Sequence, residues 1–286
     1  QPVDIPGYQI LRELHRGGQG VVYQAVQLST KRDVAVKVMR HGPFATIADR
    51  TRFEREIEIL GKLNHPNIVA VHDAGVYSGF HYFVMNFVDG KPFDEAVRGM
   101  MAGVAPAADG GAPRRSTTTR RMHLGQRRGW LELFIKVCEA VHAAHLRGVI
   151  HRDIKPSNIY VDARGEPHVL DFGIAKATDS ESLSSMTQPG QFVGSLPWAS
   201  PEQVEGTSTR IDLRTDLYSL GAVLYQLLAG ALPFDVGTNL RTAVDDILFK
   251  EPQRPSVLAA RNGQLAVDDE LDTLVITNDP IPTGVY

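Results

Sequence analysis

His-Arg-Asp-Ile-Lys-Pro-Ser-Asn, at residues 151–158, and Asp-Phe-Gly, at residues 171–173, are the stretches that decide the fold of this sequence. The first stretch places a carboxylate, an ammonium group and a carboxamide in one short loop, on Asp153, Lys155 and Asn158. A carboxylate so placed can orient or deprotonate a hydroxyl group, and an ammonium group can neutralise charge on a moving group. The loop therefore predicts a site of chemistry.

The second stretch adds a carboxylate, Asp171, at a turn that Gly173 permits. Asp171 and Asn158 both carry side-chain oxygens, and Mg²⁺ takes oxygen ligands that it usually shares with phosphate. We therefore expect Asn158 and Asp171 to hold Mg²⁺, with Mn²⁺ as an alternative ion.

The two stretches resemble the catalytic loop and the metal loop of the protein kinase family. Val-Ala-Val-Lys at residues 34–37 resembles the strand that carries the ATP-binding lysine, and Glu56 resembles the helix glutamate that pairs with it. Ser-Pro-Glu at residues 200–202 resembles the end of the activation segment. The order and spacing of these motifs hold from Gly17 to about Phe234.

The resemblance implies a bilobal α+β fold, with a strand-rich N-lobe at residues 1–88 and a mainly helical C-lobe at residues 89–286. The sequence pattern agrees, because strand-like runs precede helix-like runs. Strands are predicted at residues 8–14, 21–28, 34–39, 68–73 and 81–88. Helices are predicted at residues 48–63, 130–146 and 217–228. In the second helix, the expected buried face consists of Leu131, Phe134, Ile135, Cys138 and Val141.

Residues 100–129 lack a helical or strand period and are rich in Gly, Ala, Pro and Thr, which predicts a flexible inserted loop. Arginines dominate this region, with Asp109 as the one acid between Arg98 and Arg128. A solvated loop is one interpretation. A docking or phosphorylation segment is the other, because residues 114–117 place hydroxyl groups beside positive charge.

The resemblance also assigns the ATP site. The implied ATP-binding residues are Gly17, Gly18, Gly20, Val22, Ala35, Lys37, Glu56, Met85, Asn86 and Val88. Met85 matches the gatekeeper, and residues 86–88 match the hinge, whose backbone groups bond adenine. His15 replaces the first glycine of the family's G-x-G-x-x-G pattern, so we expect weakened but retained ATP binding. Tyr160 replaces a small aliphatic residue under adenine, where its ring either crowds the pocket or stacks.

Arg152 matches an arginine that, in the family, binds a phosphate on the activation loop. Candidate acceptors of that phosphate are Ser180, Ser182, Ser184, Ser185 and Thr187. A plain polar loop is the alternative interpretation. Ser195 matches a hydroxyl that bonds the catalytic Asp and Lys in serine/threonine kinases, and residues 141–145 resemble bacterial kinases of the eukaryotic-like class.

Four residues match a stack of side chains that links the two lobes of active kinases and is anchored by Asp216. They are Leu60, Val71, His151 and Phe172.

The resemblance implies a serine/threonine kinase that transfers the γ-phosphoryl group of ATP to protein hydroxyls, autophosphorylates and acts in signalling. Asp153 then positions the hydroxyl, Lys155 steadies the transferred group, and Asn158 completes the catalytic set. A pseudokinase that binds without transfer is the alternative, suggested by His15, Tyr160 and the C-terminal tail.

Composition limits the partners. The formal net charge of −3 gives no reason to expect nucleic acid, and no apolar run is long enough to span a membrane. One cysteine cannot form an internal disulfide, so a reducing, cytoplasmic setting is expected. The chain begins with Gln1 rather than Met, which suggests a piece of a longer protein. This piece could be the cytoplasmic domain of a membrane-anchored kinase.

The resemblance ends near the C-terminus. Residues 271–275 resemble the start of a late C-lobe helix, but residues 276–286 do not continue it. The C-lobe is therefore either truncated or divergent. No arginine follows Arg261, so Glu202 is expected to lack the arginine that pairs with the matching glutamate in the family.

Overall fold

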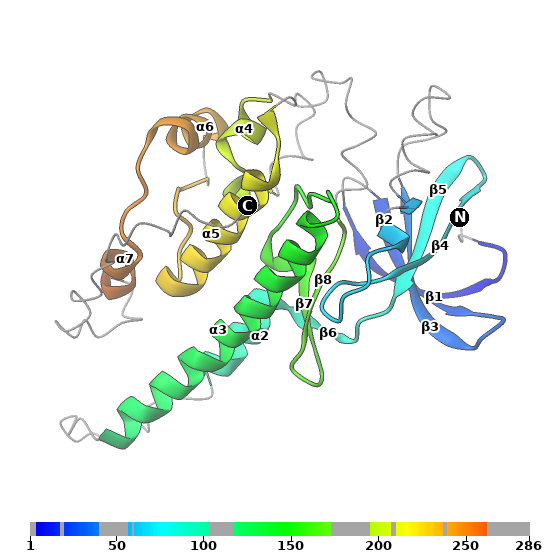
Figure 1. Ribbon diagram of the computed structural model, residues 1–286, viewed down its shortest axis with the longest axis horizontal. Helices are drawn as coiled ribbons and strands as arrows, with labels where there is room; N and C mark the ends of the chain where they lie inside the picture. Colours follow the sequence, from blue (N-terminus) through cyan, green and yellow to red (C-terminus); the bar gives the residue numbers. More distant parts are fainter. Residues whose placement is uncertain are drawn as a thin grey trace, which may run out of the picture.

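The structure is a computed structural model. It describes residues 4–17, 20–39, 57–58, 60–102, 117–172, 195–206, 210–236 and 239–261, and of these it describes only the backbone at 101–102, 117–128 and 259–261. Within these ranges the strand-rich and helix-rich parts occupy opposite ends of the molecule (Figure 1). The α+β fold class is therefore confirmed.

Five antiparallel strands form the sheet of the first part, in the order β1-β2-β3-β5-β4. The strands are β1 (Tyr8–Arg16), β2 (Gly20–Gln27), β3 (Arg32–Met39), β4 (Val71–Tyr77) and β5 (Phe80–Asn86). The strand predicted at residues 68–73 instead begins at Val71, because Ile68 pairs with Val169 in an isolated bridge. The strand predicted at 81–88 ends at Asn86. Of the helix predicted at 48–63, residues 48–56 and 59 lie outside the described residues.

A second sheet of three short strands follows, in the order β6-β7-β8. Its strands are β6 (Gly90–Pro92), β7 (Ile159–Asp162) and β8 (Pro167–Val169). A Cβ on Gly90 would lie 2.4 Å from the carbonyl oxygen of Val161, so only glycine allows this approach of β6 to β7. The predicted lobe boundary at residue 88 falls between the two sheets and remains a prediction.

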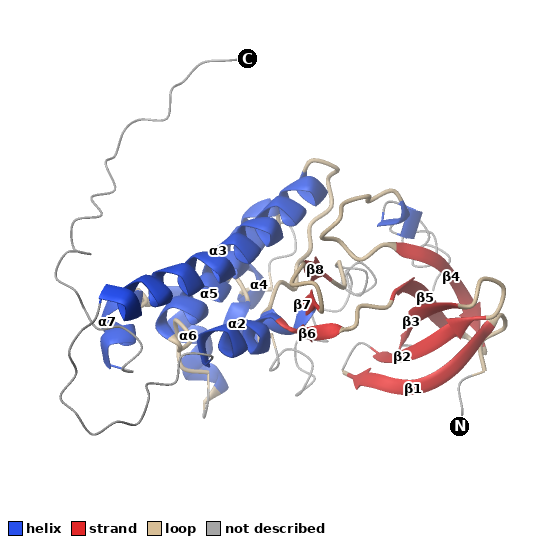
Figure 2. Cartoon of the chain, turned by 90° about the horizontal axis from the view of Figure 1, so that it is seen from below, coloured by secondary structure: helices blue, strands red, loops and turns tan. Residues whose placement is uncertain are grey.

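Helices make up most of the second part (Figure 2). They are α2 (Phe93–Ala102), α3 (Thr117–His145), α4 (Pro201–Val204), α5 (Leu213–Ala229), α6 (Leu240–Phe249) and α7 (Pro255–Arg261), with 3-10 turns at Pro156–Asn158 and Leu196–Trp198. Local signals set the bounds of α5. The carboxylate of Asp212 accepts the N–H of Arg214 as an N-cap, and Gly230 ends the helix with φ 65°.

The prediction of a loop at residues 100–129 is wrong at both ends of this range. Helix α2 continues to Ala102, and α3 already begins at Thr117. Residues 103–116 lie outside the described residues. The segment from Thr117 to Gly129 contains Arg, Gln, Leu and Met, which are good helix formers, and it extends a helix already anchored by packing further along. The search for an apolar period could not detect such a polar extension.

The predicted face of α3 is also partly wrong. Leu131 and Ile135 are 37% and 54% exposed, and Cys138 is half-buried, whereas Phe134 and Val141 are buried as expected. The buried face of this helix consists of Trp130, Leu133, Phe134, Val137, Ala140, Val141 and Ala144. Both sets have helical spacing, so the pattern alone did not decide which face packs inward.

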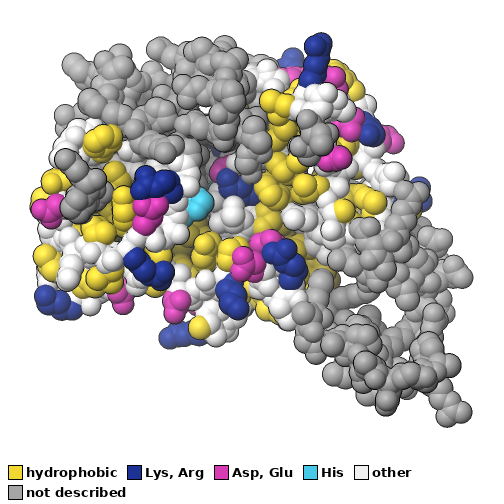
Figure 3. Space-filling model, turned by 180° about the vertical axis from the view of Figure 1, so that it is seen from behind, with side chains coloured by type: hydrophobic (Ala, Val, Ile, Leu, Met, Phe, Trp, Pro, Cys, Tyr) yellow, Lys and Arg dark blue, Asp and Glu magenta, His cyan; other side chains and the backbone are white. Residues whose placement is uncertain are grey.

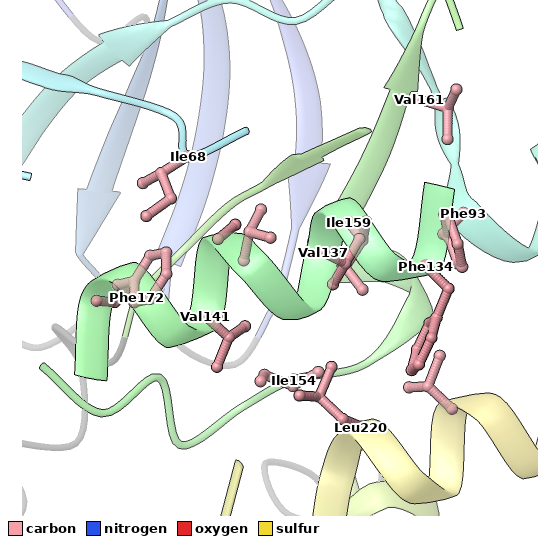
Figure 4. Close-up of a cluster of buried hydrophobic side chains, with 14 of the residues drawn as sticks. Ile68, Phe93, Phe134, Val137, Val141, Ile154, Ile159, Val161, Phe172 and Leu220 are labelled. Atoms are coloured by element: carbon pink, nitrogen blue, oxygen red, sulfur yellow. The ribbon is translucent and has the colours of Figure 1, made fainter. Parts of the chain in front are cut away.

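One large core joins the helices to the second sheet (Figure 4). Val137 and Val141 of α3 point into it, together with Ile159 of β7 and Leu220 of α5. Close packing of this kind fixes the elements relative to each other. The loop after α3 and the start of β7 therefore belong to the rigid part of the molecule.

Candidate active site

The carboxylate of Asp216 anchors the start of the loop at residues 151–158. This carboxylate is fully buried in the first turn of α5. Asp216 accepts the backbone N–H groups of His151 and Arg152, each at 2.7 Å, and lies 2.7 Å from Nε2 of His145. Burial alone would raise the pKa of Asp216, but the hydrogen bond from His145, the attraction of His151 and the two backbone N–H groups outweigh it, so the pKa is lowered. The charged carboxylate can therefore hold Arg152 at φ 65°.

Inside this loop the side chains orient one another. Nδ2 of Asn158 donates to the backbone oxygen of Asp153 at 2.8 Å and to Oδ2 of the same residue at 3.0 Å. Nζ of Lys155 lies 3.0 Å from Oδ2 of Asp153 and donates to Oγ of Ser195 at 2.8 Å. The structure thus brings together four predicted site residues.

Lys37 joins the large sheet to the loop at Asp171. Its Nζ lies 2.7 Å from Oδ2 of Asp171, and its side chain is 7% exposed. Register in the sheet places Lys37 opposite Val22 on one side and Phe83 on the other. The expected partner Glu56 lies outside the described residues, so the Lys37–Glu56 pair remains a prediction.

The donor set fits Mg²⁺. The backbone oxygen and Oδ2 of Asp153 are both acceptors, so the side-chain amide of Asn158 must turn its Nδ2 toward them. The Oδ1 atom of Asn158 then points to the other side. Asp171 offers a second oxygen ligand. Within the described ranges, no three His, Cys, Asp or Glu side chains gather as a metal cage. An ion here would therefore depend on phosphate oxygens for further ligands, as Mg²⁺ commonly does.

The expected stack is present in the structure. Leu60, Val71 and Phe172 line one pocket together with Asp171, and Val71 packs against the buried cluster that contains Leu60 and Phe172. The rings of Phe172 and His151 lie 4.6 Å apart, and the N–H of His151 reaches Asp216. A continuous chain of contacts therefore runs from β4 to α5.

The glycine-rich turn between β1 and β2 is described except for residues 18 and 19, so Gly18 lies outside it. The N–H of Gly17 donates to the oxygen of Gly20 at 2.9 Å. A Cβ on Gly20 would lie 2.2 Å from the oxygen of Val38, so the sheet itself requires this glycine. Nε2 of His15 would lie 3.2 Å from a Cβ on Gly17, so the imidazole lies close to the backbone of this glycine.

The residues expected around adenine lie at the end of the large sheet. Met85 is buried and pairs with Ala35 on β3. The N–H of Asn86 donates to the oxygen of Ala70 at 3.2 Å, so Asn86 can offer a nucleotide its carbonyl but not its N–H. Val88, half-buried, lies between β5 and β6.

Tyr160 alternates with the buried residues Ile159 and Val161 along β7, so it faces the opposite side of that strand. Burial, followed by the negative charges of Glu95 and Asp171, raises the pKa of its hydroxyl. Crowding of the adenine pocket by this ring and stacking of the ring on adenine both stay predictions.

Most of the activation segment lies outside the described residues, including Ser180, Ser182, Ser184, Ser185 and Thr187. Its end is described. Nε2 of Gln203 donates to the carbonyl oxygen of Arg152 at 2.7 Å, a contact that the sequence reasoning missed. Ser200 and Gln203 form a capping box, and the Ser-x-x-Gln pattern before α4 could have revealed it.

Glu202 has a partner other than the arginine of the family pattern. Oγ1 of Thr215 donates to its Oε1 at 2.5 Å. A hydroxyl of α5 therefore supplies a hydrogen bond to the carboxylate for which the sequence offers no late arginine.

The model of the protein kinase domain family matches residues 8–256. This chain belongs to the protein kinase domain family. It is 35% identical over 275 residues to serine/threonine-protein kinase PknB of Mycobacterium tuberculosis, covering 94% of this chain and 39% of that protein. It is 36% identical over 232 residues to serine/threonine-protein kinase pkn2 of Myxococcus xanthus, covering 80% and 25%. A probable serine/threonine-protein kinase of Corynebacterium efficiens is 35% identical over 254 residues, covering 87% and 34%.

The resemblance to bacterial serine/threonine kinases is thereby confirmed, and the kinase chain spans about a third of the length of these curated relatives. Among the helices that the structure describes, none has the length and apolar character needed to cross a membrane.

Proposed function

We propose that this chain is an active serine/threonine protein kinase that transfers the γ-phosphoryl group of ATP to a protein hydroxyl. One observation carries the proposal. Lys37 of the sheet contacts Asp171, while Asp153, Lys155 and Asn158 contact one another in the loop held by the same core. Positive and negative groups that this reaction needs therefore converge on one region, although they come from distant parts of the sequence.

Each side chain has a role in this proposal. The ammonium group of Lys37, 7% exposed, binds the α- and β-phosphates of ATP. Asp153 orients the attacking hydroxyl, and Lys155, 3.0 Å from it, balances charge on the transferred group. Catalysis then comes mainly from placement and charge, because phosphoryl transfer requires little covalent participation by the protein.

Asn158 and Asp171 would hold the divalent ion, which when bound neutralises phosphate charge. Mg²⁺ is the ion we propose, and Mn²⁺ is the alternative. The contact of Lys37 with Asp171 keeps that carboxylate beside the lysine to which we assign the phosphates of ATP.

Two observations support serine and threonine as the residues that accept phosphate: the contact of Ser195 and the names of the relatives. Nζ of Lys155 donates to Oγ of Ser195, which ties the end of the activation segment to the catalytic loop. The relatives compared above carry the name serine/threonine-protein kinase. We infer serine and threonine as acceptors, autophosphorylation within residues 180–187 with Arg152 as the proposed phosphate ligand, and a role in signalling.

Partners and compartment are proposals of the same kind. The face in Figure 3 shows Lys and Arg side chains interspersed with Asp and Glu side chains, which favours no extended nucleic-acid surface. We propose a protein substrate and a cytoplasmic setting, either as a free domain or as part of a membrane-anchored kinase.

A pseudokinase is the second candidate, favoured by the closeness of His15 to the glycine-rich turn. Replacement of Asp153 by Asn separates the two. With radiolabelled ATP, Mg²⁺ and a generic protein substrate, an active kinase should lose transfer by about 10²-fold to 10⁴-fold while ATP still binds. Asp245→Asn on the exposed surface of α6 is the matched control. Nucleotide binding without any transfer by the unaltered chain would establish the pseudokinase instead.

A further inference from the structure

The side chain of Asn86 joins three strands at one oxygen. Oδ1 of Asn86, at the end of β5, lies 2.5 Å from Nη2 of Arg32 at the start of β3. The same oxygen lies 2.5 Å from Nε2 of His72 on β4. These three residues, the Arg32–Asn86–His72 cluster, lie where the large sheet passes into the segment before β6.

The chemistry of the cluster fixes its hydrogen bonds. A guanidinium group has donors only, so the amide of Asn86 must present its oxygen to Arg32. Because that oxygen also faces His72, Nε2 of the imidazole must carry a proton. Two donors, one of them permanently charged, therefore converge on a single acceptor, and hydrogen bonds from charged donors are the stronger kind.

The backbone of β4 is irregular at this point. Val71 pairs with Met85 and Asp73 with Val84, so His72 has no residue opposite it on β5. Such a bulge changes the direction of a side chain and locally disrupts the hydrogen bonds between the two strands. His72 is the re-aimed residue, and it meets Asn86.

Asn86 is thus held at two points. Its N–H donates to the oxygen of Ala70 at 3.2 Å, and its side chain is held by Arg32 and His72. The backbone carbonyl is the third polar group of Asn86, and it is the one through which we expect this residue to meet a ligand. It follows directly after Met85, which is buried beside Ala35.

We propose that Arg32 and His72 are positioning residues that hold the carbonyl of Asn86 toward the exocyclic amino group of adenine, and thereby set the preference for ATP over GTP. This inference rests on the proposed function. Adenine offers a donor at that position, whereas guanine offers an acceptor that a fixed carbonyl repels. Loosening the cluster weakens ATP binding and reduces the discrimination.

The test measures dissociation constants of ATP-Mg and GTP-Mg by calorimetry, and KM and kcat by phosphate transfer, on the 286-residue chain. His72→Ala and Arg32→Ala should each weaken ATP binding and raise its KM by about 3-fold to 10-fold, the effect of one lost hydrogen bond. The value of kcat should stay within about 2-fold, and the ATP:GTP ratio of affinities should fall. His72→Gln, which restores an N–H donor, should recover most of the affinity.

Two controls isolate the cluster. Arg12→Ala removes an equivalent exposed bond on the same sheet, from Nε of Arg12 to Oε1 of Gln24 at 2.9 Å, and should leave both affinities unchanged. In an Asn86→Ala background, His72→Ala should have no further effect, because its acceptor is gone.

Unchanged ATP and GTP affinities in His72→Ala, an equal loss in Arg12→Ala, or a persistent His72 effect without Asn86 would each overturn the inference while the proposed function stands. A parent chain that neither binds ATP-Mg nor transfers phosphate would overturn both.

Discussion

Nζ of Lys155 donates a hydrogen bond to Oγ of Ser195 at 2.8 Å, across forty residues of chain. The bond links the loop at residues 151–158 to the 3-10 turn Leu196–Trp198, where Ser195 is the residue before the turn. Lys155 also lies 3.0 Å from Asp153, so the hydroxyl of Ser195 holds one side of the ammonium group to which we assign charge neutralisation.

Replacement of Ser195 by Ala should therefore lower kcat. A hydrogen bond to a charged group contributes about 1.5–3 kcal/mol, which corresponds to about 10-fold to 100-fold in rate. The KM for ATP should change little, since Ser195 contacts the catalytic loop and not the sheet. Ser195→Thr retains the hydroxyl and should keep most of the rate in a steady-state assay. Equal rates for Ala and Thr variants would show that this bond has no part in transfer.

Asp216 should be one of the most sensitive residues for stability. Its buried carboxylate accepts two backbone N–H groups and contacts His145, so Asp216→Leu leaves these donors without an acceptor. Loss of one member of a buried charged network costs about 3–5 kcal/mol. Urea unfolding should show this decrease in the free energy of unfolding. Asp246→Ala, on α6, removes a surface pair with Lys250 and should cost less than about 1 kcal/mol.

Acid should weaken the fold through the same carboxylate. The pKa of Asp216 lies below its ordinary value of 3.8 in the folded chain, so the unfolded chain takes up the proton first. The stabilisation is fully present above pH 3.8 and is lost as the pH falls through the lower, folded value. Removal of His145 brings the folded pKa closer to 3.8. His145→Ala should therefore reduce the dependence of unfolding free energy on pH below about 4, and an unchanged dependence would contradict this assignment.

The sequence predicted which polar side chains share the loop at residues 151–158 better than it predicted the packing around them. Asp153, Lys155 and Asn158 lie in one short stretch, so their proximity hardly depends on tertiary structure. The contact of Gln203 with Arg152 depends on how α4 packs against the loop at residues 151–158. No local sequence pattern encodes that packing. The Lys37–Asp171 contact was accessible only through the family resemblance, because sequence spacing says nothing of a contact between distant segments.

Helix α3 shows the limit most clearly. Two overlapping sets of apolar residues have helical spacing, and only contacts with α2, β8 and α5 decide which of them is buried. Val137, which the sequence reasoning passed over, is fully buried, whereas Ile135 is 54% exposed. The polar extension from Thr117 has no apolar period at all, so it could not be predicted by that signal.

The same pair of residues gives a direct stability test. Val137→Asp places a carboxylate in the large core and should destabilise the chain by several kcal/mol or prevent folding, because a buried charge without a partner is costly. Ile135→Asp, two positions away on the same helix, should change the free energy of unfolding by about 0.5 kcal/mol or less. Thermal unfolding of both variants measures the difference. Similar losses in the two variants would mean that the outer face of α3 is covered in solution.

His15 supplies the remaining prediction. Its imidazole would lie 3.2 Å from a Cβ on Gly17, so the ring is close to the glycine-rich turn to which the proposal assigns the phosphates of ATP. His15→Gly should lower the KM for ATP by about 2-fold to 5-fold, since backbone N–H groups can then approach phosphate more closely. Glycine also increases the conformational freedom of the backbone at this position. His15→Ala therefore serves as the control that removes the ring without adding that freedom. A lower KM in both variants indicates that the ring itself obstructs ATP. An unchanged KM in both would show that the imidazole already bends clear of the nucleotide, and the expected weakening of ATP binding would be wrong.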